Sequence, residues 1–141
     1  MAKAKKPTVV KTRKGAAPKT RNSGTLTESA FWSMIRSALR QKSRWWKPIA
    51  ECKQNCRRVY VGPLKKQKWE YQCNYCKKWF KDKDIAVDHI IQAGSLNNAN
   101  DLPEFVERLF VEVEGLQVLC NNGENSCHHI KTQNERKNKN N

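Results

Sequence analysis

The chain lacks long apolar runs and is poor in hydrophobic residues. Hydrophobic residues make up 38% of its 141 positions, and the mean hydropathy is -0.89. No stretch approaches the roughly 20 apolar residues of a membrane helix, and the lysine-rich N-terminus lacks the apolar core of a secretory signal. We therefore expect a cytoplasmic protein without membrane contact, formed by one domain with tails, whose small core a bound metal would help to stabilise.

Acidic residues are scarce in the first part of the chain, and basic residues are scarce in the part that follows. Residues 1–83 hold 23 of the 28 basic residues and four acids, whereas residues 84–124 hold eight acids and one basic residue, Arg108. The net charge of +15 would attract a polyanion, and the acidic segment would attract a divalent cation. A solvated lysine-rich surface is the alternative. We favour contact with nucleic acid because the charge is so unevenly distributed.

Composition also divides the chain into segments. Residues 1–24 contain eight basic residues and no acid, so we expect a flexible, disordered basic arm. Residues 25–68 are expected to form a basic extension of helix and short strands. Residues 69–137 carry the motifs described below, and residues 138–141 are expected to be a frayed tail.

Hydrophobic periodicity predicts helices and strands over most of residues 25–137. A capping box of Thr25 and Glu28 predicts a helix over about 26–41. Ser126 is expected to cap a last helix that runs from Cys127 to about 137. Between them the sequence predicts strands over 59–61, 69–72, 85–90 and 116–120, and a helix that begins at Asp101 with Pro103 in its first turn.

Four of the six cysteines form two pairs that could close one metal site. Cys73 and Cys76 have the two-residue spacing of a zinc knuckle, and Cys120 and Cys127 supply two further thiolates. In a reducing cytosol, cysteines are more often zinc ligands or free thiols than disulfides. The sequence therefore predicts one structural zinc site.

The remaining cysteines, Cys52 and Cys56, are four residues apart and would share a helix face. They could bind a second metal, or join the knuckle cysteines in a different four-cysteine site. They could also be two partly buried thiols. We favour the last interpretation because no further histidine or cysteine pair is left to complete a site with them.

Histidine is also scarce, and all three histidines lie close to the cysteine motifs. His89 follows Asp88, and His128 and His129 follow the last cysteine. A carboxylate and imidazoles are the groups that hold a catalytic metal and activate water. Adjacent residues of a helix point about 100° apart, so only one of the last two histidines can face a shared site. The sequence predicts a metal-dependent site here.

Four motifs follow one another within residues 70–135. They are Cys73-x2-Cys76, Val87-Asp88-His89-Ile90-Ile91, Leu116-Gln117-Val118-Leu119-Cys120 and Cys127-His128-His129-Ile130-Lys131-Thr132. In this order they resemble the HNH endonuclease family, in its zinc-stapled branch, which is common among small phage endonucleases. The resemblance implies an α+β fold with a small zinc-stabilised ββα-metal (His-Me finger) core, additional helices and the disordered basic arm. Residues 69–137 would then be an HNH nuclease domain.

The resemblance also implies a role for each polar residue of the motifs. His89 would be the general base that takes a proton from the attacking water. Asp88 and His128 would bind the catalytic ion, Mg²⁺ or Mn²⁺, with His129 as the alternative to His128. The four motif cysteines would bind the structural zinc.

Two basic residues of the last helix are candidates for contact with DNA. Lys131 and Arg136 lie on or near the helix of the proposed site and could hold the scissile phosphate. An ordinary solvated helix face is the alternative for both.

The chain departs from the family pattern at two places. Family members usually carry Asn just before the Leu-x-Leu-Cys run, where its side chain ties down the loop beyond the catalytic histidine. This chain has Gly115 there, so that role is vacant or is taken by another residue such as Asn97, Asn98 or Asn100. The last two motif cysteines are also further apart than the usual two residues.

The resemblance favours an endonuclease that nicks or cuts duplex DNA and leaves 5′-phosphate and 3′-hydroxyl ends. It would act as a monomer or homodimer, alone or with phage or host protein partners, and in the host cytoplasm if a phage encodes it. A non-catalytic, zinc-ribbon-like nucleic-acid-binding protein is the second hypothesis. A structural or ribosome-associated basic protein is the third, and it would not explain the placement of Asp88 and His89.

Overall fold

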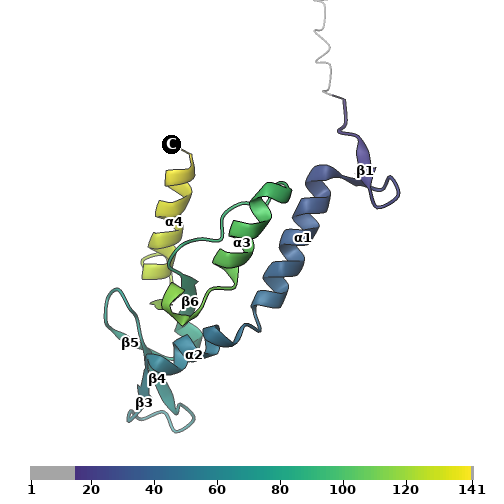
Figure 1. Cartoon of the computed structure of the whole chain (residues 1–141). Coiled ribbons are helices and arrows are strands. Elements are labelled where there is room, and N and C mark those ends of the chain that lie inside the picture. Colours follow the sequence, from purple (N-terminus) through teal and green to yellow (C-terminus); the bar gives the residue numbers. More distant parts are fainter. Residues whose placement is uncertain (1–14, 141) are drawn as a thin grey trace, which may run out of the picture.

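The computed structural model describes residues 15–140, and within them the chain folds as an α+β protein (Figure 1). Four α-helices and seven short strands form this part, and the strands pair in three small antiparallel sheets. The predicted α+β class is confirmed. None of the four helices has the length and apolar character that crossing a membrane needs. Most of the predicted arm, residues 1–14, lies outside the described residues.

The end of the predicted arm lies in a hairpin. Strand β1 (Lys19–Arg21) pairs with strand β2 (Leu26–Thr27). Arg21 donates two hydrogen bonds, of 2.9 and 3.0 Å, to the carboxylate of Glu28, and its guanidinium lies 4.4 Å from the ring centroid of Phe31. These contacts attach the hairpin to the helix that follows, so the structured basic extension begins before residue 25.

Helix α1 (Glu28–Ser43) begins two residues later than the sequence predicts. Thr27 is its N-cap, because its hydroxyl accepts a 3.1 Å hydrogen bond from the backbone N–H of Ala30. The prediction of Thr25 as N-cap is wrong, since that hydroxyl donates at 2.8 Å to the carbonyl of Asn22. Thr25 thus closes the hairpin turn, while Thr27 starts the helix.

The basic middle of the chain forms a short helix and a three-stranded sheet. Helix α2 (Lys47–Asn55) leads into strands β3 (Arg57–Val59), β4 (Trp69–Gln72) and β5 (Trp79–Phe80), which pair in that order. The strand predicted over 59–61 overlaps β3 only at Val59, where β3 ends, whereas the strand predicted over 69–72 is confirmed as β4. This sheet ends directly before the first cysteine pair.

The motif residues lie on a two-stranded sheet and the helix that follows it. Strand β6 (Ile85–His89) pairs antiparallel with strand β7 (Leu116–Cys120), and Asp88 lies opposite Gln117. Helix α4 (Cys127–Lys139) packs beside this pair (Figure 1). The chain therefore has two antiparallel strands followed by a helix in the region where the motifs occur.

Both ends of helix α4 can be compared with the prediction. Ser126 is the N-cap, as predicted, and its hydroxyl lies 3.4 Å from the backbone nitrogen of His129. The helix continues to Lys139, so two residues of the predicted tail are helical. The sequence placed the beginning of this helix well because a serine cap precedes it, whereas no glycine or proline marks its end.

Helix α3 (Leu102–Leu109) lies in the connection between β6 and β7 and packs against α1. Pro103 lies in its first turn, as predicted. Phe105 and Leu109 are only 1% and 2% exposed, and they pack with Trp32 of α1. Burial of such a side chain contributes about 1.5–3 kcal/mol. The core is divided into three small clusters of this kind, so no single large core stabilises the fold.

Candidate metal centre and adjoining acidic site

Four cysteine sulfurs meet at the junction of three elements. Cys73 and Cys76 lie in the turn after β4, Cys120 ends β7, and Cys127 begins α4. The four sulfur atoms all lie within 4.8 Å of one another. Zinc binds four thiolates at about 2.3 Å in a tetrahedron, whose sulfurs are then roughly 3.8 Å apart. This four-sulfur cluster therefore fits a structural metal such as zinc, as the spacing predicted.

Backbone N–H groups surround the first sulfur of the cluster. Burial opposes ionisation of Cys73, but hydrogen bonds from the backbone of Cys76, Cys120 and Tyr75 lower its pKa to about 7. The turn is closed by a 3.0 Å hydrogen bond from the N–H of Lys77 to the carbonyl of Cys73. Such a turn presents a thiolate that is ready to bind a cation.

The last sulfur of the cluster behaves in the opposite way. Burial and the neighbouring sulfurs of Cys120 and Cys73 raise the pKa of Cys127 to about 12. A further negative charge is unfavourable beside a thiolate unless a cation balances both. A divalent metal bound by the four sulfurs would balance their charge, so all four cysteines would then be thiolates.

The two other cysteines lie apart from the four-sulfur cluster. Cys52 is 7% exposed and packs against Tyr71 and Val118, and burial followed by the proximity of Cys56 raises its pKa to about 11. The thiol of Cys56 donates a 3.3 Å hydrogen bond to the carbonyl of Lys53. The structure thus places both as packed thiols, the interpretation that the sequence favoured.

A second polar group lies beside the four-sulfur cluster, on the face of β6 that carries Asp88. We call it the acidic site. It consists of Asp88 of β6, Gln117 of β7, and His128, Lys131 and Glu135 of α4. The side chain of Asp88 is 14% exposed and that of His128 is 30% exposed, so the site is accessible from solvent.

Each oxygen of the Asp88 carboxylate has its own neighbours. Oδ2 accepts a 2.8 Å contact from Lys131 Nζ and a 3.3 Å hydrogen bond from Gln117 Nε2. Oδ1 lies 3.8 Å from His128 Nε2. One carboxylate oxygen is thus held by an ammonium and an amide group, and the other faces an imidazole nitrogen.

Lys131 is more deeply involved in the acidic site than a phosphate-binding residue on an open helix face would be. Its ammonium group contacts Asp88 and Glu135 and donates a 3.1 Å hydrogen bond to the carbonyl of His89. Burial alone would lower the pKa of Lys131, but the two carboxylates outweigh it and raise the pKa. Arg136, the other predicted phosphate contact, is exposed in the last turn of α4.

His89 points away from Asp88, as neighbouring residues of a strand do. Its Nε2 lies 2.9 Å from the carbonyl oxygen of Leu109. A carbonyl only accepts, so Nε2 of the neutral ring donates and Nδ1 keeps its lone pair. Within residues 15–140, no hydrogen bond or ion pair joins this ring to Asp88 or to His128.

The two adjacent histidines of α4 have different neighbours. His128 lies beside Asp88, whereas His129 Nε2 lies 2.9 Å from the amide nitrogen of Gln133 on an exposed part of the helix. The structure thus brings His128, and not His129, to the acidic site.

Within residues 15–140, none of the asparagines considered for the vacant position near Gly115 forms a hydrogen bond with the His89 side chain. Asn98 accepts hydrogen bonds from the backbone of Asn100 and Asp101 in its own turn. The loop after His89 is instead held by the backbone, where the N–H of Ile90 donates at 3.0 Å to the carbonyl of Gly115. A side chain at position 115 would meet Val111 at 3.0 Å, so glycine fits a close approach there.

Gln117 and Glu135 are site residues that sequence reasoning missed. Gln117 also accepts a 3.0 Å hydrogen bond from Asn74 Nδ2, so one side chain joins the cysteine turn to Asp88. A lone polar residue within the apolar strand Leu116–Cys120 was the available signal. For Glu135 the signal was its spacing of four residues from Lys131.

A hollow of about 500 Å³ adjoins the acidic site. It lies between the cysteine turn and α4, and its lining includes Tyr75, Gln117, Lys131 and Glu135. A ligand in this hollow would contact Gln117 and Lys131, which hold Asp88, but Asp88 and His128 themselves are not among its lining residues. Comparison of the chain with family models, curated proteins and solved structures finds no match.

Proposed function

We propose that the protein is a metal-dependent endonuclease of the HNH type that hydrolyses DNA phosphodiester bonds. The observation that carries the proposal is the pairing of Asp88 with His128 at 3.8 Å, on a strand–strand–helix unit beside the four-sulfur cluster. The first ligand comes from β6 and the second from the first turn of α4, in the order that the motifs predict.

Asp88 and His128 are the proposed ligands of the catalytic ion, Mg²⁺ or Mn²⁺. When bound, the ion would neutralise charge on the scissile phosphate and on the departing 3′ oxygen. Gln117 and Lys131 fix one oxygen of Asp88 by hydrogen bonds of 3.3 and 2.8 Å, which leaves the other oxygen directed at His128. These bonds orient the carboxylate before the ion arrives.

His89 is the proposed general base. Its hydrogen bond to the carbonyl of Leu109 favours the tautomer with a free Nδ1 lone pair. That lone pair takes a proton from water while the water oxygen bonds to phosphorus and the bond to the 3′ oxygen breaks. The 3′ oxygen leaves with a proton from solvent, so the products are a 5′-phosphate and a 3′-hydroxyl.

The four-sulfur cluster has a structural role in this proposal. A metal such as zinc there would hold the turn after β4 against the end of β7 and the beginning of α4, the elements that carry Gln117 and His128. The exposed Arg136 would contact the phosphates of the substrate, which the net charge of +15 attracts, whereas the ammonium group of Lys131 is already held by Asp88, Glu135 and the carbonyl of His89.

The test is relaxation of supercoiled plasmid DNA with Mg²⁺, with Mn²⁺ and with EDTA. Cleavage should stop in EDTA, and His89→Ala should slow it by about 10²-fold or more because the general base is lost. His129→Ala is the matched control, since that ring lies 2.9 Å from Gln133 and away from Asp88, and it should cleave at nearly the wild-type rate. Equal cleavage by wild type and His89→Ala would contradict the assignment.

One observation favours a second candidate, a zinc-ribbon-like protein that binds nucleic acid without cutting it. The His89 ring is bonded to the carbonyl of Leu109, which a purely structural histidine would also do. In that case the wild-type protein would bind DNA in EDTA and would not cleave it with any divalent ion.

A further inference from the structure

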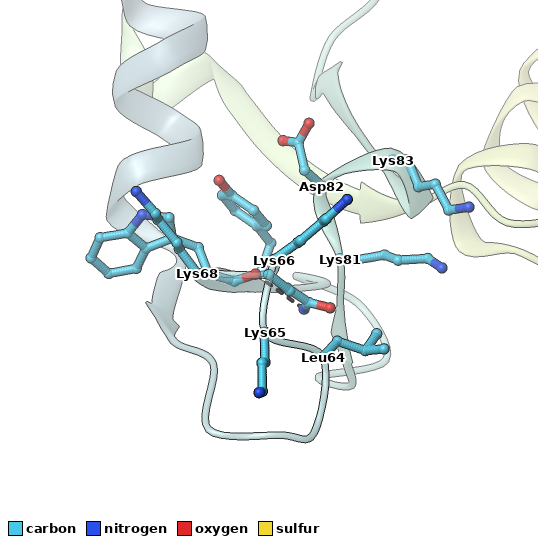
Figure 2. A pocket seen from close by; sticks show the side chains of 10 residues that line it. Leu64, Lys65, Lys66, Lys68, Lys81, Asp82 and Lys83 are labelled. Atoms are coloured by element: carbon cyan, nitrogen blue, oxygen red, sulfur yellow. Dashed lines mark hydrogen bonds between the residues drawn. The ribbon is translucent and has the colours of Figure 1, made fainter.

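A second hollow lies away from the acidic site, on the basic three-stranded sheet. It has a volume of about 600 Å³ and lies between the loop that joins β3 to β4 and the segment that follows β5 (Figure 2). We call it the basic hollow. Its lining residues that matter here are Lys65, Lys66, Lys68, Lys81, Lys83 and Trp69.

The acids of this region are already neutralised by other residues. Residues 57–83 hold nine basic residues and two acids, Glu70 and Asp82. Glu70 pairs with Arg58, and Asp82 pairs with Lys53 of α2. The excess positive charge of the hollow is therefore not cancelled from within its own sheet.

The lysines of the hollow have little local compensation. Lys81 lies 4.0 Å from Asp84, at the limit of an ion pair. Within residues 15–140, the other four lysines of the hollow form no ion pair. The lining of the hollow thus carries five ammonium groups and one carboxylate, that of Asp82, so its net charge is positive and attracts a polyanion.

Aromatic residues form part of the wall of the hollow. Trp69 and Tyr71 of β4 line it, and Trp69 is still 36% exposed although it lies under the guanidinium of Arg57 at 3.9 Å. Lysines combined with an aromatic wall are typical of surfaces that follow a nucleic-acid backbone, because phosphates bind the cations while sugars or bases pack on the rings.

The ammonium groups point in different directions. In the view of Figure 2, Lys65 extends downward, Lys66 extends upward in the direction of Asp82, and Lys81 and Lys83 extend to the right. A single compact phosphate would need convergent donors, whereas a chain of phosphates suits donors that are spread out. We propose that the basic hollow binds the sugar-phosphate backbone of a nucleic-acid strand, outside the acidic site.

The identity of the ligand as DNA rests on the proposed function, but binding can be measured without cleavage. Fluorescence anisotropy of the full-length protein with a labelled DNA duplex in EDTA gives affinity over a salt series. Replacing Lys65, Lys66 and Lys68 together by Gln should lower affinity about tenfold or more and reduce the salt slope by roughly 2–3, because each lost phosphate contact removes about 0.9. Lys81→Gln with Lys83→Gln should act in the same direction with a smaller slope change.

A control of equal net charge separates a site from a general charge effect. Lys19, Lys42 and Lys47 are exposed outside the hollow, and replacing these three by Gln should change affinity much less. An equal loss in the control, or no loss in the hollow variants, would overturn the proposal. So would binding of a poly-aspartate chain as tight as that of DNA.

The same assay distinguishes this inference from the proposed nuclease function. Wild-type protein that binds DNA through the hollow but never cleaves it would refute the nuclease and leave the hollow supported. If the wild-type protein cleaved DNA and the hollow variants bound and cleaved it normally, the nuclease would be supported and the role of the basic hollow refuted.

Discussion

The four-sulfur cluster and the acidic site lie next to each other but differ in composition and exposure. The cluster contains a single kind of donor, and Cys73 and Cys120 are 0% and 4% exposed. The acidic site mixes two carboxylates, an imidazole, an amide and an ammonium group, and His128 is 30% exposed. Structural zinc sites are closed by protein ligands, whereas catalytic metal sites keep positions open for water or substrate. The buried four-sulfur cluster therefore suits a structural metal, and the exposed acidic site has the accessibility that the proposed reaction needs.

The two regions are also joined. Gln117 accepts a hydrogen bond from Asn74 of the cysteine turn and donates one to Asp88. Cys127 and His128 are consecutive residues of α4, so the end of the helix that contributes to the four-sulfur cluster also positions the histidine. A substitution in the four-sulfur cluster should thus alter the acidic site, while a substitution in the acidic site should leave the four-sulfur cluster intact.

The largest effect is expected from removing one sulfur of the four-sulfur cluster. Cys73→Ser removes a ligand, and because a structural zinc contributes about 10–16 kcal/mol of binding free energy, its loss should unfold the domain. Elemental analysis should find about one zinc per wild-type chain and much less in the variant, and circular dichroism should show lost structure. Cys56→Ser is the matched control, since that thiol lies outside the four-sulfur cluster and donates to the carbonyl of Lys53. A folded, zinc-free wild-type protein would contradict this prediction.

A smaller effect is expected from cutting the connection between the sites. Gln117→Leu removes both hydrogen bonds of the side chain, so Asp88 is held less firmly, and cleavage or affinity for Mn²⁺ should fall about 10–100-fold. Zinc content should stay unchanged. Gln133→Leu is the control, because Gln133 is exposed and its side-chain amide lies 2.9 Å from His129 Nε2, outside the acidic site. Loss of zinc in Gln117→Leu would show that the two regions cannot be separated.

The sequence predicted the four-sulfur cluster more completely than the acidic site. The two-residue spacing identified Cys73 and Cys76, and the order of the motifs placed Cys120 and Cys127 with them. The alternative grouping with Cys52 and Cys56 stayed open in the sequence, and the structure brings together the four motif cysteines. The helix and strand periods placed β4, β7 and the start of α4. The direction of a side chain within a strand or helix depends on contacts between distant elements, so the partners of His89 and Lys131 could not be predicted.

The same reason explains the smaller errors. Thr25 and Thr27 are both good caps by composition, and the choice between them depends on the hairpin of β1 and β2, which pairs residues on either side of the turn. Gln117 was overlooked because its importance arises from its position opposite Asp88 across the strands. Pairing of this kind appears only when the register is known.

The smallest effect is expected from a change far from both sites, and it tests whether loss of stability alone imitates the larger effects. Thr27→Ala removes the N-cap of α1 and should lower the free energy of unfolding by about 1 kcal/mol, measured by chemical denaturation. Thr25→Ala should cost less because Thr25 bonds only a turn carbonyl. Zinc content and cleavage rate should match wild type in both variants. If Thr27→Ala lost zinc or activity, the different effects of substitutions in the four-sulfur cluster and in the acidic site would reflect global stability rather than local chemistry.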